Sequence, residues 1–364
     1  MNSASRYHRQ ILLPQIGTEG QRRISESAAA VVGIGALGSV SANLLARAGV
    51  GRLLLIDRDF LEIQNLQRQV LFDEDDLRAN LPKAVAAQRK LQKVNSEIKI
   101  EAEPTDLNAD TLDGLLEGMD LVVDGTDNFE TRFLINDYSL REKTPWIYGA
   151  AVGMEGSSYV VLPGEGPCLR CLFEEAPQSG EFQTCDTAGI LAPMAHVIAS
   201  FQAAEALKIL AGKREDVDRR LWKIDIWKKE FKSVNVGHLS HPLRAYSPSP
   251  SARRAGGGPK GKGGRCSGCS RANYPYLSRD LGSRTVTLCG RNAVQIYRGE
   301  RARIDFQNLA RKLSGVGAVK YNDYLLKASI APYEITVFQN GRAIIQGTED
   351  AAQAKSVYAK YIGG

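Results

Sequence analysis

Membrane-spanning segments and export signals are the first features that the sequence lacks. Its longest run without a charged residue, 27–46, has the length of a membrane span, but it contains three glycines followed by two serines and an asparagine. A buried strand that leads into a helix explains this composition better. The first 14 residues are mixed and polar, unlike a secretory signal, so we expect a cytoplasmic protein without a membrane anchor.

Acidic residues are missing from one segment of the chain, whose overall net charge is +6. Residues 231–279 contain nine lysines and arginines and no aspartate or glutamate, so the rest of the chain is net negative. Because residues 247–264 are rich in glycine, serine and proline, we interpret 239–265 as a basic, solvated linker. An arm that binds nucleic acid is the alternative, which we do not favour.

Cysteine is also scarce, with six residues among 364, which excludes a disulfide-rich secreted domain. Four of the six form two C-x-x-C pairs, Cys168 with Cys171 and Cys266 with Cys269. Two such pairs supply four thiolates for a closed, tetrahedral zinc site of the structural kind, and unliganded buried thiols are the alternative. Cys289 follows an apolar strand and is expected to be a small core residue.

A glycine-rich turn is the most informative feature that the sequence does contain. Residues 30–38 predict a buried strand that breaks into a helix, with Gly33, Gly35 and Gly38 in the G-x-G-x-x-G spacing that lets a phosphate approach the backbone. Asp57 ends the next apolar strand, 19 residues after Gly38, which suits a carboxylate that binds a ribose hydroxyl. These features alone fit NAD or FAD as well as ATP.

Three further side chains favour ATP over a hydride carrier. Arg68 and Lys83 are cations suited to a triphosphate, and Asp127 is a carboxylate suited to Mg²⁺. Arg68 and Asp127 follow predicted strands, and ligands bind at the carboxyl edge of open α/β sheets. Asp127 could instead cap a helix over 128–140. The alternative functions are an NAD(P)-dependent oxidoreductase and a non-catalytic scaffold of the same fold.

Alternating strand and helix patterns predict an α/β fold with a Rossmann-like, mostly parallel sheet and helices on both faces. The expected elements are a helix over 14–26, strands over 28–34, 52–57, 98–102 and 120–124, helices over 37–48, 82–94 and 192–210, and strand regions over 146–162 and 221–236. From residue 281 the pattern changes to a small α+β unit, with strands over 284–297, 317–328 and 333–346 and helices over 305–313 and 349–361. We therefore expect an ATP-binding domain over 5–238, completed by the cysteine pair at 266–269, and an accessory domain over 281–364.

The order of the motifs along the chain is itself informative. The chain reads Arg6-Tyr7-His8-Arg9-Gln10-Ile11, G-I-G-A-L-G, Asp57-x-Asp59, N-L-Q-R-Q, Pro82-Lys83 and G-T-D-N in this order. From about residue 5 to residue 236, and in its two cysteine pairs, it resembles the MoeB/ThiF/HesA family. Members of that family are bacterial relatives of ubiquitin-activating enzymes and adenylate the C-terminus of a ubiquitin-like sulfur carrier.

The resemblance implies a ThiF-type adenylation domain that uses ATP, Mg²⁺ and Zn²⁺. With the glycine motif, it implies the cofactor-binding residues Gly33, Gly35, Ala36, Gly38, Asp57, Asp59, Gln64, Asn65, Arg68, Gln69, Lys83, Asp127 and Asn128. The catalytic residues that it implies are Arg9, Arg68, Lys83, Asp127 and Cys185. Arg9 corresponds to an arginine supplied across a homodimer interface. Cys185, in T-C-x-x-A-G, corresponds to a cysteine that links covalently to the carrier in some members.

The resemblance also implies the reaction and the partners. We expect an adenylyltransferase that converts the C-terminal glycine carboxylate of a MoaD/ThiS-like sulfur carrier to an acyl-adenylate, with release of pyrophosphate, for sulfur transfer in cofactor or thionucleoside biosynthesis. A second copy of the chain and a sulfurtransferase or cysteine desulfurase are the other expected partners; nucleic acid and membrane are not. Many relatives end in a rhodanese domain, but 281–364 contains no cysteine in a glycine-rich loop, so we expect it to support carrier recognition or dimer formation.

Overall fold

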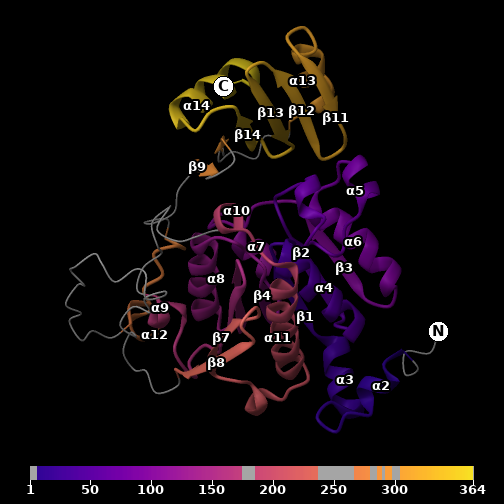
Figure 1. Cartoon of the computed structure of the whole chain (residues 1–364), viewed down its shortest axis with the longest axis vertical. Helices are drawn as coiled ribbons and strands as arrows, with labels where there is room; N and C mark the ends of the chain where they lie inside the picture. Colours follow the sequence, from indigo (N-terminus) through magenta and orange to yellow (C-terminus); the bar gives the residue numbers. More distant parts are fainter. Residues whose placement is uncertain are drawn as a thin grey trace. The chain divides into compact units, whose positions relative to one another are not determined.

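The structure is a computed structural model, and it describes residues 6–173, 185–236, 266–278, 285–288, 292–296 and 304–363. The described residues form two compact units, one up to residue 281 and one from residue 282 onward (Figure 1). Each unit is described by itself. The expected linker 239–265 and Cys289 lie outside the described residues.

An eight-stranded sheet forms the centre of the first unit, in the order β3-β2-β1-β4-β5-β6-β7-β8. The strands are β1 (Ala28–Val32), β2 (Arg52–Ile56), β3 (Lys99–Glu103), β4 (Leu121–Asp124), β5 (Trp146–Val152), β6 (Glu155–Val161), β7 (Arg220–Asp225) and β8 (Glu230–Asn235). The first five in this order of the sheet, β3 to β5, run parallel, and β6, β7 and β8 continue the sheet antiparallel. The predicted Rossmann-like, mostly parallel sheet is confirmed.

Helices cover both faces of this sheet (Figure 1). They are α2 (His8–Ile11), α3 (Gly17–Glu26), α4 (Ala36–Ala48), α5 (Glu74–Arg78), α6 (Lys83–Val94), α7 (Leu112–Leu116), α8 (Phe129–Glu142), α9 (Leu169–Leu172), α10 (Cys185–Ala188), α11 (Ala192–Leu210) and α12 (Ser267–Arg271), with 3₁₀ turns η1 (Ile63–Asn65) and η2 (Arg214–Asp216). On one face, α4 and α11 pack around Met194 and Ile198. On the other, α7 and α8 pack around Leu116 and Phe133. Every residue of β1 and β4 is buried because both faces are covered.

Three glycines meet where β1 passes into α4 and where β4 ends. Gly33 has a φ of +82°, which favours glycine. A Cβ atom on Gly38 would collide with the carbonyl oxygen of Gly33, and one on Gly125 would lie 2.8 Å from the Cα of Gly38. The first turn of α4 can therefore approach the ends of β1 and β4 closely. A side chain at any of these three positions would hold the helix further from the strands.

A six-stranded antiparallel sheet, in the order β11-β12-β13-β14-β10-β9, forms the second unit. Its elements are β9 (Thr285–Leu288), β10 (Ala293–Ile296), α13 (Phe306–Leu313), β11 (Ala318–Tyr321), β12 (Leu325–Ile330), β13 (Tyr333–Phe338), β14 (Ala343–Gln346) and α14 (Ala351–Tyr361). Both helices contribute to one core with the strands, including Leu313 from α13 and Val357 from α14. The predicted α+β class is confirmed.

Three strand predictions in this unit were wrong in detail. The single strands expected over 284–297, 317–328 and 333–346 are each a pair of antiparallel strands, β9 with β10, β11 with β12, and β13 with β14. Asn340 and Gly341 lie between the last two, and Gly341 has a φ of +79°. An Asn-Gly dipeptide is typical of a hairpin turn, and both residues of the turn divide what was expected to be one strand. Among the described helices of both units, none is long and apolar enough to span a bilayer.

Glycine-to-alanine changes should separate the tight contact at Gly125 from ordinary helix positions. We expect G125A to lower the free energy of unfolding of the first unit by about 2 kcal/mol, because its Cβ has no space against Gly33 and Gly38. The matched control is G114A in α7, where a Cβ meets nothing within 4 Å and should raise stability by about 0.5–1 kcal/mol. Thermal and urea unfolding of both variants measure the difference. Equal midpoints for the two would contradict the packing argument.

Candidate active site

The candidate active site lies where the chain leaves three neighbouring parallel strands. β1 pairs with both β2 and β4, so the segments 33–38, 57–59 and 125–128 that follow them are neighbours at one edge of the sheet. Backbone hydrogen bonds join these exits: Gly33 N donates to Ile56 O and Gly125 N donates to Val32 O, each at 2.7 Å. Ligands in open α/β sheets bind at such an edge.

Asp57 is buried and holds the glycine turn in place. Its carboxylate accepts hydrogen bonds from Ile34 N at 2.6 Å and Asp59 N at 2.7 Å. Burial raises the pKa of Asp57, and the charge of Lys83 and the two N–H donors oppose that rise. The residue predicted to bind a ribose thus also fixes the backbone of the turn that it faces.

Lys83 is the first residue of α6 and is nearly inaccessible to solvent, with 5% of its surface exposed. Its Nζ lies 3.6 Å from Asp59 Oδ2, and its backbone N donates to Asp59 O at 2.9 Å. The ion pair with a carboxylate offsets the cost of burying the ammonium group, so a positive charge can be kept at the sheet edge. The structure therefore brings Lys83, Asp57 and Asp59 together.

Arg58, between the two aspartates, is a cation that the sequence analysis did not single out. It forms an ion pair with Asp106 at 3.1 Å. Burial lowers the pKa of Arg58, but the surrounding carboxylates, including Asp127, outweigh burial and raise it overall. The site thus contains one more positive charge than the motifs indicated. Its signal in the sequence was only its place inside Asp57-x-Asp59.

The N-L-Q-R-Q motif lies against the glycine turn. Asn65 is buried at the end of η1, and its side chain accepts a hydrogen bond from Glu62 N at 3.0 Å. Gln69 is 3% exposed, its Nε2 would lie 3.8 Å from a Cβ on Gly35, and its Oε1 has no hydrogen-bond partner within the described part of the chain. A buried polar atom without a partner is costly unless something binds to it.

Arg68 and Gln64, from the same motif, are less buried than Asn65 and Gln69. Arg68 Nη1 donates to Gln64 O at 2.8 Å, which ties the arginine to its own segment. Gln64 is exposed, and its side chain contacts Glu62. The guanidinium group is therefore near the site but is not buried in it.

Asp127 and Asn128 follow β4 and differ in what they contact. Asn128 caps α8, because its Oδ1 accepts a hydrogen bond from Thr131 N at 2.8 Å. The helix-capping role that was the alternative for Asp127 therefore belongs to Asn128. Asp127 is exposed and makes no hydrogen bond or ion pair to any residue that the structure describes. Its carboxylate is free for a ligand.

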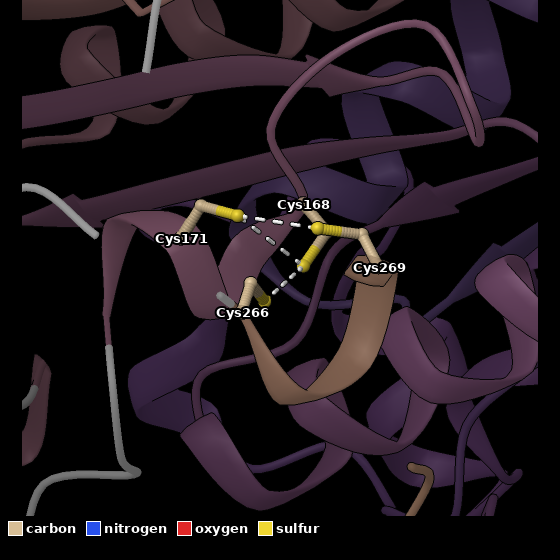
Figure 2. Close-up of side chains that lie close together, drawn as sticks. All are labelled: Cys168, Cys171, Cys266 and Cys269. Atoms are coloured by element: carbon tan, nitrogen blue, oxygen red, sulfur yellow. Dashed lines mark hydrogen bonds between the residues drawn. The ribbon is translucent and has the colours of Figure 1, made fainter. Parts of the chain in front are cut away.

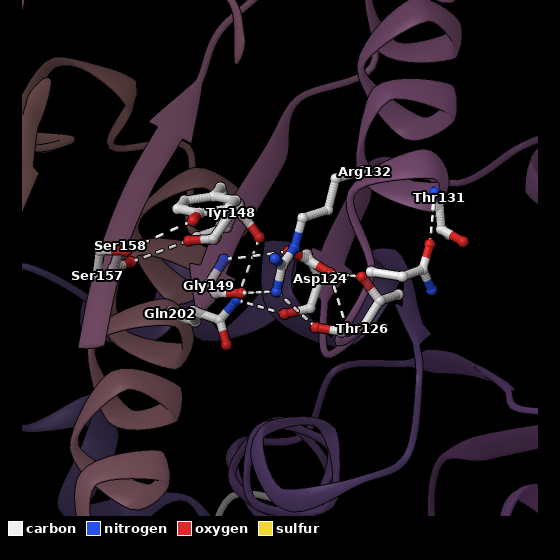
Figure 3. Close-up of polar contacts among 11 residues, drawn as sticks. Asp124, Thr126, Thr131, Arg132, Tyr148, Gly149, Ser157, Ser158 and Gln202 are labelled. Carbon is white, nitrogen blue, oxygen red and sulfur yellow. Dashed lines mark hydrogen bonds and ion pairs between the residues drawn. The ribbon is translucent and has the colours of Figure 1, made fainter. Parts of the chain in front are cut away.

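A buried polar network supports this loop from behind (Figure 3). Asp124, the last residue of β4, accepts hydrogen bonds from Arg132 Nε at 2.9 Å and from the hydroxyl of Thr126 at 2.6 Å. Gln202 from α11 donates to Asp124 O at 2.7 Å. Thr126 was noted only as part of the G-T-D-N motif. Asp124, Arg132 and Gln202 were not expected from the sequence, because a charged pair inside a strand–helix unit leaves no motif.

Of the expected catalytic residues, Arg9 is not brought to this edge within one chain, whereas α10 lies beside the C-terminal end of β5, where Gly153 N donates to Gly189 O at 2.8 Å. Arg9 is exposed on α2, and the adjacent Gln10 donates to Ala48 O at the C-terminal end of α4. Because α4 spans 13 residues, or about 20 Å, Arg9 lies near the opposite end of that helix from the glycine turn. Cys185 begins α10, but its side chain lies outside what the structure describes.

The four cysteines of the two C-x-x-C pairs form one cluster, with all four sulfur atoms within 4.8 Å of one another (Figure 2). The Sγ–Sγ distances are 3.9 Å for Cys168–Cys171, 3.6 Å for Cys168–Cys266 and 3.5 Å for Cys171–Cys269. A tetrahedron with metal–sulfur bonds of about 2.3 Å has sulfur atoms about 3.8 Å apart. The cluster is therefore compatible with a zinc ion.

Buried contacts join this cluster to α8. Leu169 N donates to Asn136 Oδ1 at 2.8 Å, and Arg170 pairs with Asp137 at 2.9 Å. Tyr276 N donates to the same carboxylate at 3.1 Å, so the residues after the second cysteine pair are also attached. Burial raises the pKa of Asp137 to about 6, although Arg170 opposes the rise.

Comparisons with known proteins agree with this geometry. The model of the ThiF family matches residues 7–244. The chain belongs to the ThiF family. It is 39% identical over 359 residues to the "Sulfur carrier protein ThiS adenylyltransferase" of Bacillus subtilis, which covers 98% of this chain and 99% of that relative. It is 40% identical over 236 residues to the "Sulfur carrier protein adenylyltransferase" of Thermus thermophilus, which covers 64% of this chain and 86% of that relative.

Solved structures give the same fold. This ThiF-family chain resembles the crystal structure of E. coli MccB with ATP, at 26% identity and a TM-score of 0.56, over 64% of this chain and 72% of MccB. Family and relatives together make the chain an adenylyltransferase. They do not favour an oxidoreductase or a non-catalytic scaffold.

Proposed function

We propose that this chain uses ATP to adenylate the C-terminal glycine carboxylate of a ubiquitin-like sulfur carrier. The observation that carries the proposal is the N-terminus of α4, where Gly35 provides no side-chain cap for the first backbone N–H groups of the helix. Free backbone N–H groups at a helix N-terminus bind phosphates. The names of the relatives from B. subtilis and T. thermophilus, and the ATP bound to MccB, support the same function.

ATP would bind with its phosphates at this helix N-terminus and its ribose at Asp57. Asp57 already accepts two backbone hydrogen bonds, and a carboxylate has room for more acceptor contacts. Ala36, the first residue of α4, would offer its backbone N–H to a phosphate. Gly33, Gly35 and Gly38 would let the phosphates come close, and Gln64, Asn65, Gln69 and Asn128 would line the remainder of the site.

The reaction joins two anions, so cations are needed at the sheet edge. A carboxylate oxygen of the carrier attacks the α-phosphorus of ATP, the bond from that phosphorus to the bridging oxygen breaks, and pyrophosphate leaves with the electron pair. Lys83 and Arg68 would stabilise the charge on the α-phosphate and on the leaving pyrophosphate. Asp127 and the nearby Asp59 would hold Mg²⁺, which supplies further positive charge when bound.

The carrier would dock on the antiparallel end of the sheet. β7 runs in the same direction as β5, so the turns after both strands lie at the same edge as the active site. Met154, Trp227 and Phe231, which lie in or beside these turns, are 43%, 69% and 54% exposed. β8 is an edge strand with every residue exposed, and edge strands bind other β-folds. A small β-fold carrier fits this surface, with its tail directed to the α-phosphate.

The remaining roles are part of the same proposal. Zn²⁺ would be held by Cys168, Cys171, Cys266 and Cys269, where it would supply bonds that join the two pairs. Arg9, far from the site of its own chain, would serve the site of the second subunit of a homodimer, and Cys185 would accept the activated carrier. The unit from residue 281 would be an accessory domain of this cytoplasmic enzyme, and a sulfurtransferase or cysteine desulfurase would supply the sulfur.

Carrier-dependent exchange of pyrophosphate into ATP tests the central activity. We expect D127A to lower this exchange by about 100-fold or more, because the carboxylate that would hold Mg²⁺ is lost from an exposed position that does not support the fold. The matched control is E117A, which removes an exposed carboxylate before the opposite end of β4. Exchange that survives D127A undiminished, or falls equally with E117A, would reject the assignment.

Metal analysis of the purified protein tests the cysteine cluster. We expect one zinc per chain, which C168S or C269S should remove with a clear loss of stability, because metal binding and folding are coupled. C185S lies outside the cluster and should retain the metal. The absence of zinc from freshly purified wild-type protein would overturn this proposal.

Replacing exposed aromatic residues of this surface with aspartate tests where the carrier docks. A W227D/F231D variant should raise the KM for the carrier by about tenfold or more, since aspartate removes apolar contact area at the centre of the surface. ATP affinity is the internal control and should not change. An unchanged KM would show that the carrier binds elsewhere.

A further inference from the structure

Arg132 is a buried arginine near the start of α8 that contacts one carboxylate and two backbone carbonyls behind the active-site loop (Figure 3). Its Nε donates to Asp124 Oδ2 at 2.9 Å, and its Nη2 donates to Thr126 O at 2.6 Å and Gly149 O at 2.9 Å. Only 6% of its side chain is exposed, and the side chain of Asp124 is fully buried. The planar guanidinium group presents its donors in a fixed fork that sets the direction of all three contacts, which the rotatable donors of an ammonium group do not.

Thr126, which immediately precedes Asp127, is fixed at each of its polar groups. Its N–H donates to Asp124 Oδ1 at 2.9 Å, its hydroxyl donates to the same oxygen at 2.6 Å, and its carbonyl accepts from Arg132. On the other side, Asn128 is fixed by the cap of α8. The backbone on both sides of Asp127 is therefore held, while the carboxylate of Asp127 is exposed.

The guanidinium group is itself held in one orientation. Its Cζ lies 5.3 Å from the ring centre of Phe129 and 5.1 Å from that of Tyr148. Asp124 accepts a further bond from Gly149 N at 3.3 Å, which adds β5 to the network. The guanidinium group is therefore paired with a carboxylate, lies against two aromatic rings and is hydrogen-bonded to the loop. These contacts together hold the loop in one conformation.

We infer that Arg132 is a positioning residue that orients Asp127 for the metal-bound triphosphate, acting through the carbonyl of Thr126. The inference rests on the proposed function, in which Asp127 holds Mg²⁺. Arg132 touches neither nucleotide nor metal in this scheme. Its loss should therefore weaken the contribution of the metal to ATP binding and leave the metal-free binding of ATP unchanged.

The test compares R132K with a structurally matched arginine. Calorimetry would measure the Kd of ATP with Mg²⁺ and with EDTA for each protein. In R132K we expect the affinity gained from Mg²⁺ to fall by about five- to tenfold, because the loop loses its contacts to one or two carbonyls, while the Kd in EDTA is unchanged. Lysine keeps the charge beside Asp124, so the core should remain folded.

R170K is the matched control. Arg170 also pairs at 2.9 Å with a fully buried aspartate, Asp137, is 7% exposed at its side chain and lies over two aromatic rings, but it contacts the cysteine cluster region instead of the loop. R170K should lose a similar amount of thermal stability and keep the full gain from Mg²⁺. An equal loss of that gain in R170K would mean that destabilisation alone explains the effect, and the inference would be wrong.

A second pair of variants covers the case in which R132K does not fold. T126V removes the hydroxyl bond to Asp124 from the loop side, and T126S keeps it. We expect T126V to lose part of the Mg²⁺ gain and T126S to retain it. If Mg²⁺ raises the ATP affinity of the wild-type protein, and raises that of R132K and T126V by the same factor, only the positioning role is wrong. A wild type that shows no gain from Mg²⁺ overturns the proposed metal role of Asp127 and the inference with it.

Discussion

The close contact among Gly33, Gly38 and Gly125 is the constraint on which the rest of the first unit depends. It brings the N-terminus of α4 to the boundary between β1 and β4, because no side chain separates the helix from either strand. That boundary is where the chain changes direction across the sheet, with β2 and β3 on one side of β1 and β4 and β5 on the other. A site for phosphates at this point follows from the topology and needs no special loop.

Much of the parallel core could be predicted because its signals are local. A run of apolar residues ending in spaced glycines specifies a strand, a turn and a helix within one short segment. The hairpins of the second unit could not be separated as easily. β13 and β14 are apolar on both sides of Asn340-Gly341, so the segment has the composition of one long strand, and only the turn dipeptide marks the division. The apolar composition of the segment therefore favoured one strand more strongly than the Asn-Gly dipeptide favoured a turn.

The residues of the candidate site also differ in how well the sequence predicts them. Asp57 and Asp127 follow strand ends, and Lys83 follows Pro82 at the start of a helix, so the sequence indicated their positions, and the roles assigned to them stay predictions. Asp124 and Arg132 could not be found, since a charged pair eight residues apart leaves no motif, and the network that it joins includes β5 and α11. Whether Asp127 or Asn128 caps α8 depends on a shift of one residue, which composition cannot resolve because both types are good caps.

The four-cysteine cluster has a consequence for the stability of the first unit. Val236 and Cys266 are both buried in the core of the first unit, so the chain between them starts and ends at anchored points. The entropy of closing a loop grows only with the logarithm of its length, at about 0.6 kcal/mol for each doubling. Because Cys168 and Cys266 are 98 residues apart in the sequence, a metal held by both pairs would restrict the unfolded chain over that whole span, and small changes in the number of residues within it should alter this contribution to stability only slightly.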